Sequence, residues 1–286
     1  MQIIAATDFS TRSTRALRQA GLLAQDDSQL HIVHVVDDDL PRAMVVAERR
    51  EAERVLQEQI DGIRELRNIV AHSMVVEGDP FDGIVRAAQS VNADLIVMGA
   101  HRKQVLLDMF VGTTIERVIR KTEVPVLMVN NEAQQSYKSV LVPIEISDPS
   151  VNALRVALSL GLASHGNATL LHAFSALAKG KMYSSDSVSA TSDHYAAEGQ
   201  QHAEGEIVAF LGSHNLNTGR WAIRAHEGGP MEVISRTVSE MRPDLLVMGT
   251  HSRTGLIKTL LGSVTEEVLR SLDVDILVVP PPKQVS

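Results

Sequence analysis

Short apolar runs alternate along the chain with longer stretches in which apolar residues recur every three or four positions. In the first 130 residues the apolar runs are QIIAAT (2–7), LHIVHVV (30–36), AHSMVVEG (71–78), DLIVMG (94–99) and VPVLMV (124–129). The stretches with helical spacing between them are 13–25, 48–66, 81–91 and 113–121. Strands that alternate with helices indicate βαβ units, so the pattern predicts an α/β fold with a five-stranded parallel sheet and helices on both faces.

The second half of the chain repeats the pattern of the first half. Residues 94–129 align without a gap with residues 244–279, and 14 of these 36 positions are identical. The offset is 150 here, whereas it is 137 between the openings at 3–17 and 140–154. A period of this length indicates a duplicated domain, because the repeats of solenoid proteins run to about 20–50 residues.

The change of offset implies about twelve extra residues in the second copy, between its second and third strands. These residues map onto 179–199, a stretch rich in Ser, Asp and Gly that predicts a mobile loop. We therefore predict two tandem domains, residues 1–132 and 137–286, with the insertion in the second. A chain of 286 residues suits two domains, since domains of about 100–150 residues are the most common.

Each copy has a glycine where its fourth strand ends and another where the following helix begins. These glycines are Gly99 and Gly112 in the first copy and Gly249 and Gly262 in the second. Glycine lets a backbone approach a ligand, and the free N–H groups at a helix start attract anions. In doubly wound sheets the ligand sits beyond the carboxyl ends of the strands, so these loops predict phosphate sites.

The same residues also have an ordinary structural explanation. A glycine can simply end a strand, and Thr113 or Ser263 can simply cap a helix. For a single copy the structural explanation is favoured, because the motif is loose. Its repetition at identical spacing, on the same strand–loop–helix element, favours the phosphate site.

At these loops the chain resembles the tandem universal stress proteins of the UspA type. The segments GAHR (99–102) with GTT (112–114), and GTHS (249–252) with GSV (262–264), are similar to the family signature G-x-x-G, nine residues, G-[ST]. The resemblance covers nearly the whole chain except 179–199. It implies two Rossmann-like domains of the adenine-nucleotide alpha hydrolase type that bind ATP, ADP or AMP. If the ligand is ATP, Mg²⁺ is expected with it, because the phosphate oxygens leave charge to neutralise.

The resemblance also implies which residues line each site, and it implies no catalytic residue and no protein ligand for a metal. In the first copy these residues are Ala6, Thr7, Asp8 and Val35 on the base side and Gly99, Arg102, Gly112, Thr113 and Thr114 on the phosphate side. In the second copy they are Pro143, Ile144, Glu145 and Ala173, and then Gly249, Ser252, Gly262, Ser263 and Val264.

The chain departs from the family signature at three of these positions. Arg102 and Ser252 stand where the second signature glycine is expected, and Glu145 stands where the first copy has Asp8. Arg102 either supplies a cation to a phosphate or fills its space, whereas Ser252 still donates a hydrogen bond. The second copy is therefore predicted to hold the better phosphate loop and the first copy the better base pocket. Asp8 has a structural alternative, because an Asp or Ser commonly caps the helix that opens there.

Composition narrows the function classes. The formal net charge of −8 gives no electrostatic reason to bind nucleic acid or an anionic membrane. The absence of cysteine excludes disulfides, zinc ribbons and thiol nucleophiles, and no two histidines show HxxxH spacing. The N-terminus lacks a secretory signal, and no run reaches eighteen apolar residues. We therefore expect a soluble, cytoplasmic protein whose core is aliphatic, since only 3% of its residues are aromatic.

Three functional hypotheses stay open at this point. The first is a nucleotide-binding regulator that responds to stress or energy state. The second is a scaffold that acts through protein contacts alone, and the Arg102 and Glu145 departures motivate it. The third is a slow ATPase or self-phosphorylating enzyme that uses Asp8, although no GxxxxGK[ST], GxGxxG or GxSxG motif occurs. The resemblance further implies that strands 124–129 and 274–279 pair across the two domains as a pseudo-dimer, and it leaves a homodimer open.

Overall fold

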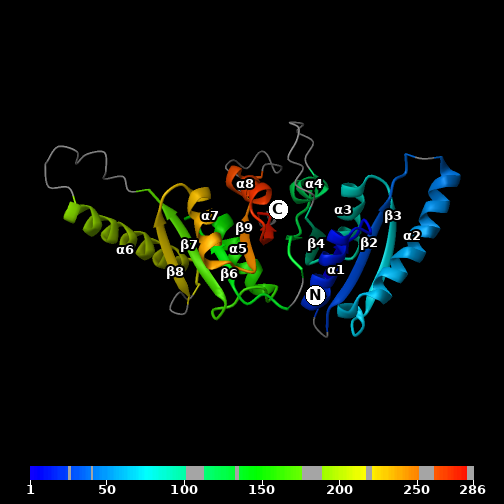
Figure 1. The fold of residues 1–286 in the computed structure, drawn as a ribbon, viewed down its shortest axis with the longest axis horizontal. Helices are drawn as coiled ribbons and strands as arrows, with labels where there is room; N and C mark the ends of the chain where they lie inside the picture. The colour runs from blue at the N-terminus through cyan, green and yellow to red at the C-terminus, as the bar shows by residue number, and fades with distance from the viewer. Residues whose placement is uncertain are drawn as a thin grey trace. The chain divides into compact units, whose positions relative to one another are not determined.

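The computed structural model describes residues 1–24, 27–39, 41–100, 113–132, 135–175, 189–216, 221–250 and 261–281, without the side chains of 189–197. Strands and helices alternate in both halves (Figure 1). The first half contains β1 (Gln2–Ala6), α1 (Thr11–Leu23), β2 (Gln29–Val36), α2 (Arg42–Gly62), the 3-10 helix η1 (Arg64–Leu66), β3 (Ala71–Glu77), α3 (Pro80–Ser90), β4 (Leu95–Gly99), α4 (Thr114–Lys121) and β5 (Val126–Val129). The second half contains β6 (Val140–Pro143), α5 (Asp148–Ser159), β7 (Ala168–Phe174), α6 (Ser189–Ser213), β8 (Ala222–Glu227), α7 (Pro230–Met241), β9 (Leu245–Gly249), α8 (Ser263–Ser271) and β10 (Asp275–Val279).

The chain forms two compact units. The first comprises Met1–Ser136, Thr250–Gly262 and Asp273–Ser286, and the second comprises Tyr137–Gly249 and Ser263–Leu272. Strand β10 therefore belongs to the second repeat by sequence and to the first unit by contact. The domain limits expected from the repeat, 1–132 and 137–286, remain a prediction.

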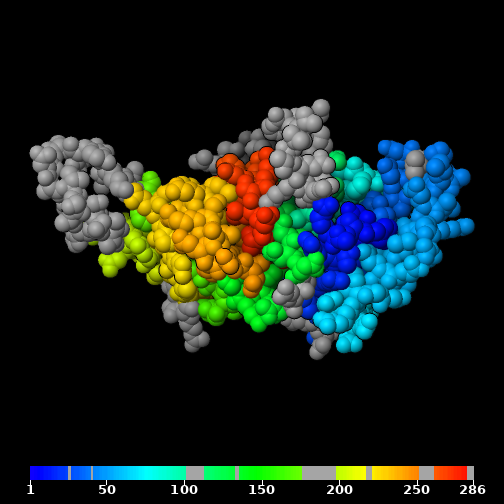
Figure 2. Space-filling view, viewed as in Figure 1, coloured from blue at the N-terminus to red at the C-terminus, as the bar shows by residue number. Residues whose placement is uncertain are grey.

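The sheet of the first unit has the strand order β3-β2-β1-β4-β5-β10. Strands β1 to β5 pair in parallel, and β10 runs antiparallel to β5, with Ile276 opposite Met128 and Val278 opposite Val126. The predicted pairing of the two last strands is thus confirmed. Strand order reverses between β1 and β4, as in a doubly wound sheet. Helix α2 runs along β3 (Figure 1), and in Figure 2 the dark-blue surface of the N-terminal residues adjoins the lighter blue surface that follows it.

The sheet of the second unit has the order β9-β6-β7-β8, and all three of its strand pairs are parallel. In both units the side chains of the strands are mostly aliphatic and buried, as expected from the composition. Fully buried examples are Ile3, Ile4, Leu95, Ile96, Leu127, Leu141 and Leu170. Continuous apolar strands of this kind are typical of parallel sheets with both faces covered. In the described part of the chain no helix has both the length and the apolar composition that a membrane crossing requires.

The second helix differs from its prediction at both ends. The sequence pattern predicts it over 48–66, but α2 begins at Arg42 and ends at Gly62, and a 3-10 helix follows. The early start is explained by Val45, which is buried with Val36 and Ala52. An apolar contact with the sheet therefore extends the helix beyond the charged run on which the prediction rests.

The prediction of a mobile loop at 179–199 is wrong from residue 189 onward, because α6 begins there. Residues 179–188 lie outside the described residues. The helical part contains Ala190, Ala196, Ala197 and Glu198, which favour helix. Further along α6, Ala203, Ile207 and Leu211 recur at helical spacing and are buried, so packing on the second unit stabilises the helix.

Candidate functional site

The expected site residues of the first copy lie at the carboxyl ends of its strands. Those that the structure describes there are Ala6, Thr7, Asp8, Val35 and Gly99, whereas Thr113 and Thr114 lie at the start of helix α4. The register sets Ala6 opposite Val33 of β2 and Ala5 opposite Val97 of β4, so the residues that follow β1 lie between the ends of these two strands. We call this edge the first rim. It is the place where strand order reverses and where such sheets bind ligands.

Thr7 holds the first rim together through hydrogen bonds from its side chain and its backbone. Its hydroxyl donates to Gln59 Oε1 at 2.9 Å, lies 3.1 Å from Ser13 Oγ and accepts the Phe9 N–H at 3.0 Å. Its carbonyl accepts a hydrogen bond from His34 Nδ1 at 2.9 Å. Thr7 is buried, so these bonds tie the end of β1 to α1, α2 and β2 and give the rim a defined shape.

Asp8 is the exposed acid of the first rim. Its carboxylate accepts the Ser10 N–H at 3.0 Å, which forms a tight local turn. Partial burial acts to raise the pKa of Asp8, but hydrogen bonds from Ser10 and Ser13 outweigh it and hold the pKa below its usual value. The carboxylate is therefore charged at neutral pH.

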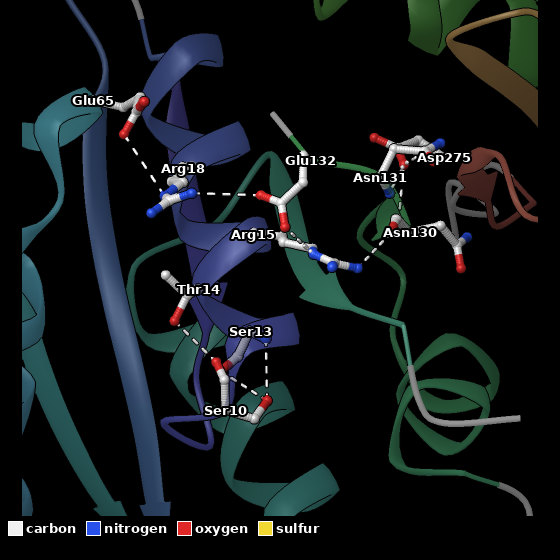
Figure 3. Close-up of polar contacts among 10 residues, drawn as sticks. All are labelled: Ser10, Ser13, Thr14, Arg15, Arg18, Glu65, Asn130, Asn131, Glu132 and Asp275. Atoms are coloured by element: carbon white, nitrogen blue, oxygen red, sulfur yellow. Dashed lines mark hydrogen bonds and ion pairs between the residues drawn. The ribbon is translucent and has the colours of Figure 1, made fainter. Parts of the chain in front are cut away.

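The cap of helix α1 is Ser10 and not Asp8. Ser10 Oγ accepts the Ser13 N–H at 3.3 Å, and its carbonyl accepts the Thr14 hydroxyl at 2.9 Å (Figure 3). Of the two candidate caps in the segment that opens this helix, the structure uses the serine. Asp8 precedes the cap by two residues, with carboxylate oxygen to spare for a further hydrogen bond.

The second copy repeats these bonds with different side chains. His172 Nδ1 donates to the carbonyl of Ile144 at 2.7 Å, as His34 does to Thr7. The Glu145 N–H donates to Ser150 Oγ at 3.0 Å, in the position where Asp8 faces Ser13. Pro143 and Ala173 are half-buried beside them, at the ends of β6 and β7. The second unit thus has an equivalent second rim with an exposed glutamate.

Gly99 and Gly249 are required for close packing of a helix on the end of each fourth strand. Neither has a positive φ. A Cβ at Gly99 would lie 2.5 Å from the Arg12 carbonyl oxygen, and a Cβ at Gly249 would lie 2.7 Å from the Pro149 carbonyl oxygen. The first turn of α1 or α5 therefore packs directly on the end of β4 or β9. Glycine allows this close approach, which sets the position of each helix start beside its rim.

Helix starts lie at the far end of each expected loop, as predicted. Thr113 caps α4, since its Oγ1 accepts the Glu116 N–H at 3.4 Å, and Thr114 is the first residue of that helix. Helix α8 begins at Ser263, and Thr265 Oγ1 donates to the Gly249 carbonyl at 3.2 Å, which ties α8 to the end of β9. Of the remaining expected residues, Gly262 and Val264 are half-buried, whereas Arg102, Gly112 and Ser252 lie outside the described residues.

A third pair of equivalent glycines, Gly78 and Gly228, lies at the ends of β3 and β8. Their φ values are 133° and 144°, which favour glycine. Each donates its N–H to the neighbouring strand, Gly78 to Val36 at 2.9 Å and Gly228 to Phe174 at 3.0 Å. The turn at Gly78 ends β3 at the edge that forms the first rim, and the turn at Gly228 ends β8 at the edge that forms the second rim.

Sequence reasoning missed the polar residues that shape the rims, above all Ser13, Ser150 and Gln59. A signal for two of them was present, because Ser10 and Ser13 align with Ser147 and Ser150 in the two openings. Gln59 could not be found in this way, since it reaches Thr7 from a helix 52 residues further along the chain.

Comparison with known proteins bears on this duplicated architecture. A family model described as "Universal stress protein family" matches residues 1–130 and 136–280. Universal stress protein E homolog of Haemophilus influenzae is 25% identical over 213 residues, 71% of this chain and 67% of that protein. Universal stress protein E of Escherichia coli K12 is 26% identical over 212 residues, 71% of this chain and 65% of that protein. The chain thus matches about two thirds of the length of these relatives.

Solved structures show the same fold. The crystal structure of a universal stress protein from Archaeoglobus fulgidus DSM 4304 matches with a TM-score of 0.68 and 20% identity, and the match covers 98% of each chain. A putative universal stress protein from Pseudomonas aeruginosa UCBPP-PA14 matches with a TM-score of 0.63 and 18% identity, over 98% of this chain and 93% of that one. With two family matches that together cover nearly all of its length, the chain belongs to the universal stress protein family and carries two tandem copies of its domain.

Proposed function

We propose that this protein binds an adenine nucleotide at the first rim and that the bound nucleotide makes it a regulator that responds to stress or energy state. The observation that carries the proposal is the duplicated rim, in which the same backbone hydrogen bonds and the same close glycine contact recur. The two copies keep this geometry although their side chains differ. This indicates that the edge of the sheet is kept for binding. The resemblance of the two glycine loops to the family signature supports the same ligand.

The charges at the first rim suit a nucleotide. The ionised Asp8 carboxylate is an acceptor for ribose hydroxyls or for the adenine amino group. The start of α4 offers free backbone N–H groups and the positive end of the helix dipole to a phosphate. One edge of the sheet therefore supplies an acceptor for the sugar or base and donors for the phosphates.

The second rim is less suited to the base and ribose. Its acid is Glu145, which has one more methylene group than Asp8 and reaches further from the strand end. We therefore propose one tightly bound nucleotide per chain, in the first unit. If the nucleotide is ATP, Mg²⁺ accompanies it on the phosphate oxygens. A reducing, cytoplasmic setting belongs to the same proposal and rests on a chain of 286 residues that has no cysteine.

The test compares Asp8→Asn with Glu145→Gln by isothermal titration with ATP, ADP and AMP, with and without Mg²⁺. An asparagine oxygen still accepts the Ser10 N–H, so the turn is kept and only the charge is lost. Hydrogen bonds to charged groups contribute about 1.5–3 kcal/mol, so Asp8→Asn is expected to weaken binding about 10- to 100-fold. Glu145→Gln is the matched control and is expected to leave the affinity of the first rim unchanged.

A direct measurement of the ligand complements the titration. The purified protein is denatured, and the small molecules that it releases are identified and counted by mass spectrometry. One adenine nucleotide per chain supports the proposal. No released nucleotide, together with no thermal shift at millimolar ATP and Mg²⁺, contradicts it, because a ligand that binds the folded state must stabilise that state.

A further inference from the structure

In the antiparallel pair β5–β10, equivalent positions of the two repeats are arranged symmetrically about the centre of the pair. Leu127 lies opposite Leu277 at the centre, and the flanking pairs are Met128 with Ile276 and Val126 with Val278. Because the two strands align at an offset of 150, each pair on one side of the centre corresponds to the pair on the other side. A strand of this kind can in principle pair with the equivalent strand of a second chain just as well as with its partner in the same chain.

At one end of the pair a buried carboxylate joins the two strands. Asp275 is 3% exposed, and its Oδ1 accepts the N–H of Asn130 at 2.8 Å and of Asn131 at 3.0 Å (Figure 3). In return, Asn130 Nδ2 donates to the Val274 carbonyl at 2.6 Å. We call these contacts the aspartate clamp. It ties the first residues after β5 to the first residue of β10.

The asparagines of the clamp are also held from helix α1. Arg15 Nη1 donates to the Asn130 carbonyl at 3.2 Å, and Arg15 Nε lies 2.6 Å from Glu132 Oε1 (Figure 3). Arg18 adds a longer contact to the same glutamate at 3.4 Å. Helix α1 therefore fixes the backbone at Asn130, to which Asp275 binds.

The corresponding residues at the other end cannot form such a clamp. At an offset of 150, Pro125 stands in the place of Asp275, and Pro280 and Pro281 stand in the places of Asn130 and Asn131. Proline has no carboxylate and no backbone N–H. One strand thus carries an acid at its start and prolines at its end, and the other carries a proline at its start and asparagines at its end.

We propose that this asymmetry makes β5 select β10 of the same chain and reject a second copy of itself. In a β10–β10 pair between two chains, each buried Asp275 would meet Pro280 and Pro281, which offer no N–H. In a β5–β5 pair, the N–H groups that follow β5 would meet Pro125, which offers no carboxylate. Buried polar groups without partners are costly, so both pairings between like strands are disfavoured. In the β5–β10 pair, Asp275 at one end receives the N–H groups of Asn130 and Asn131. At the other end, Pro125 has no carboxylate that would need an N–H donor.

The test uses a single-cysteine reporter, which is possible because the chain has no cysteine of its own. Leu127 is the centre of the β5–β10 pair, so residue 127 would also be the centre of a β5–β5 pair; in the full-length Leu127→Cys protein, a disulfide between two chains is therefore expected only if β5 pairs with β5. The added change Asp275→Ala is expected to raise the fraction of chains cross-linked under mild oxidation at least about tenfold. The matched control is Val278→Ala, which loosens the same buried strand pair without touching the clamp.

A second variant gains the clamp instead of losing it. Pro125→Asp makes β5 complementary to itself, because each introduced carboxylate would meet the Asn130 and Asn131 N–H groups of the other chain. It is expected to raise cross-linking more than Asp275→Ala does, and adding Asn130→Pro and Asn131→Pro is expected to abolish the gain. The proposal is overturned if Asp275→Ala cross-links no more than Val278→Ala. It is equally overturned if Pro125→Asp yields no more dimer than the reporter alone.

Discussion

The close contact beneath the second rim makes a quantitative prediction for Gly249→Ala. The new Cβ would lie 2.7 Å from the Pro149 carbonyl oxygen and 3.1 Å from its carbon. Both atoms belong to the backbone at the first turn of α5, so no side-chain rotation relieves the contact and the helix start must shift. Overpacking of this kind costs about 1–3 kcal/mol, which corresponds to about 4 °C in Tm for each kcal/mol in a unit of this size.

The native Trp221 provides the assay. It is the only tryptophan of the chain, belongs to the second unit and is buried beside His165. Its fluorescence during urea unfolding reports the free energy of unfolding of that unit. Gly205→Ala is the matched control, because Gly205 lies within α6 of the same unit and a Cβ there meets nothing within 4 Å.

The two substitutions are expected to act in opposite directions. Gly205→Ala should stabilise the unit by about 0.5–1 kcal/mol, since alanine favours helix over glycine. A Gly249→Ala protein as stable as the parent would refute the conclusion that helix packing, rather than strand ending alone, requires glycine at this position.

Three further predictions concern acid stability and the rims. Glu77 accepts hydrogen bonds from Arg42 and Arg49, which lower its pKa. The stability that these bonds contribute is present above the ordinary pKa of glutamate and is lost as the pH falls through the lowered pKa. Glu77→Gln should therefore reduce the loss of stability that urea unfolding measures below about pH 4.5. Desolvation, and then repulsion from the stacked His72, lower the pKa of His31, so stability should fall as pH drops below about 6.5, and His72→Gln should reduce this loss. Ser150→Ala removes the acceptor of the Glu145 N–H and should cost about 1 kcal/mol by Trp221 fluorescence, whereas an unchanged midpoint would show that this bond does not support the second rim.

Much of the fold could be predicted because the relevant signals are local. The apolar runs that form β1, β4 and β5 are continuous, and a strand buried on both faces needs little else to be recognised. The two offsets of the repeat also indicated the extra residues before β8. The prediction failed where packing decides, since α2 starts early to bury Val45 and part of the expected loop forms α6 because three of its apolar residues reach the second unit.

The candidate site shows the same division. Asp8, Gly99, Thr113 and their equivalents were found from spacing along the chain; Asp8 and Gly99 lie at the ends of strands, and Thr113 lies at the start of α4, as expected. The bonds that shape the rims join residues far apart in sequence, such as Thr7 and Gln59, and no local pattern reveals them. The reason for the glycine is also tertiary, because it depends on how near α1 comes to β4.

By itself, the sequence determined that this protein consists of two similar α/β domains with glycine loops at equivalent strand ends, because periodicity and repetition are properties of a chain read in order. Only the tertiary structure decided that Ser10 and not Asp8 caps α1, that Thr7 bonds to a helix far along the chain, and that Asp275 clamps the residues after β5. These outcomes depend on which buried donor meets which acceptor, and that is settled by the distances between atoms that folding brings together.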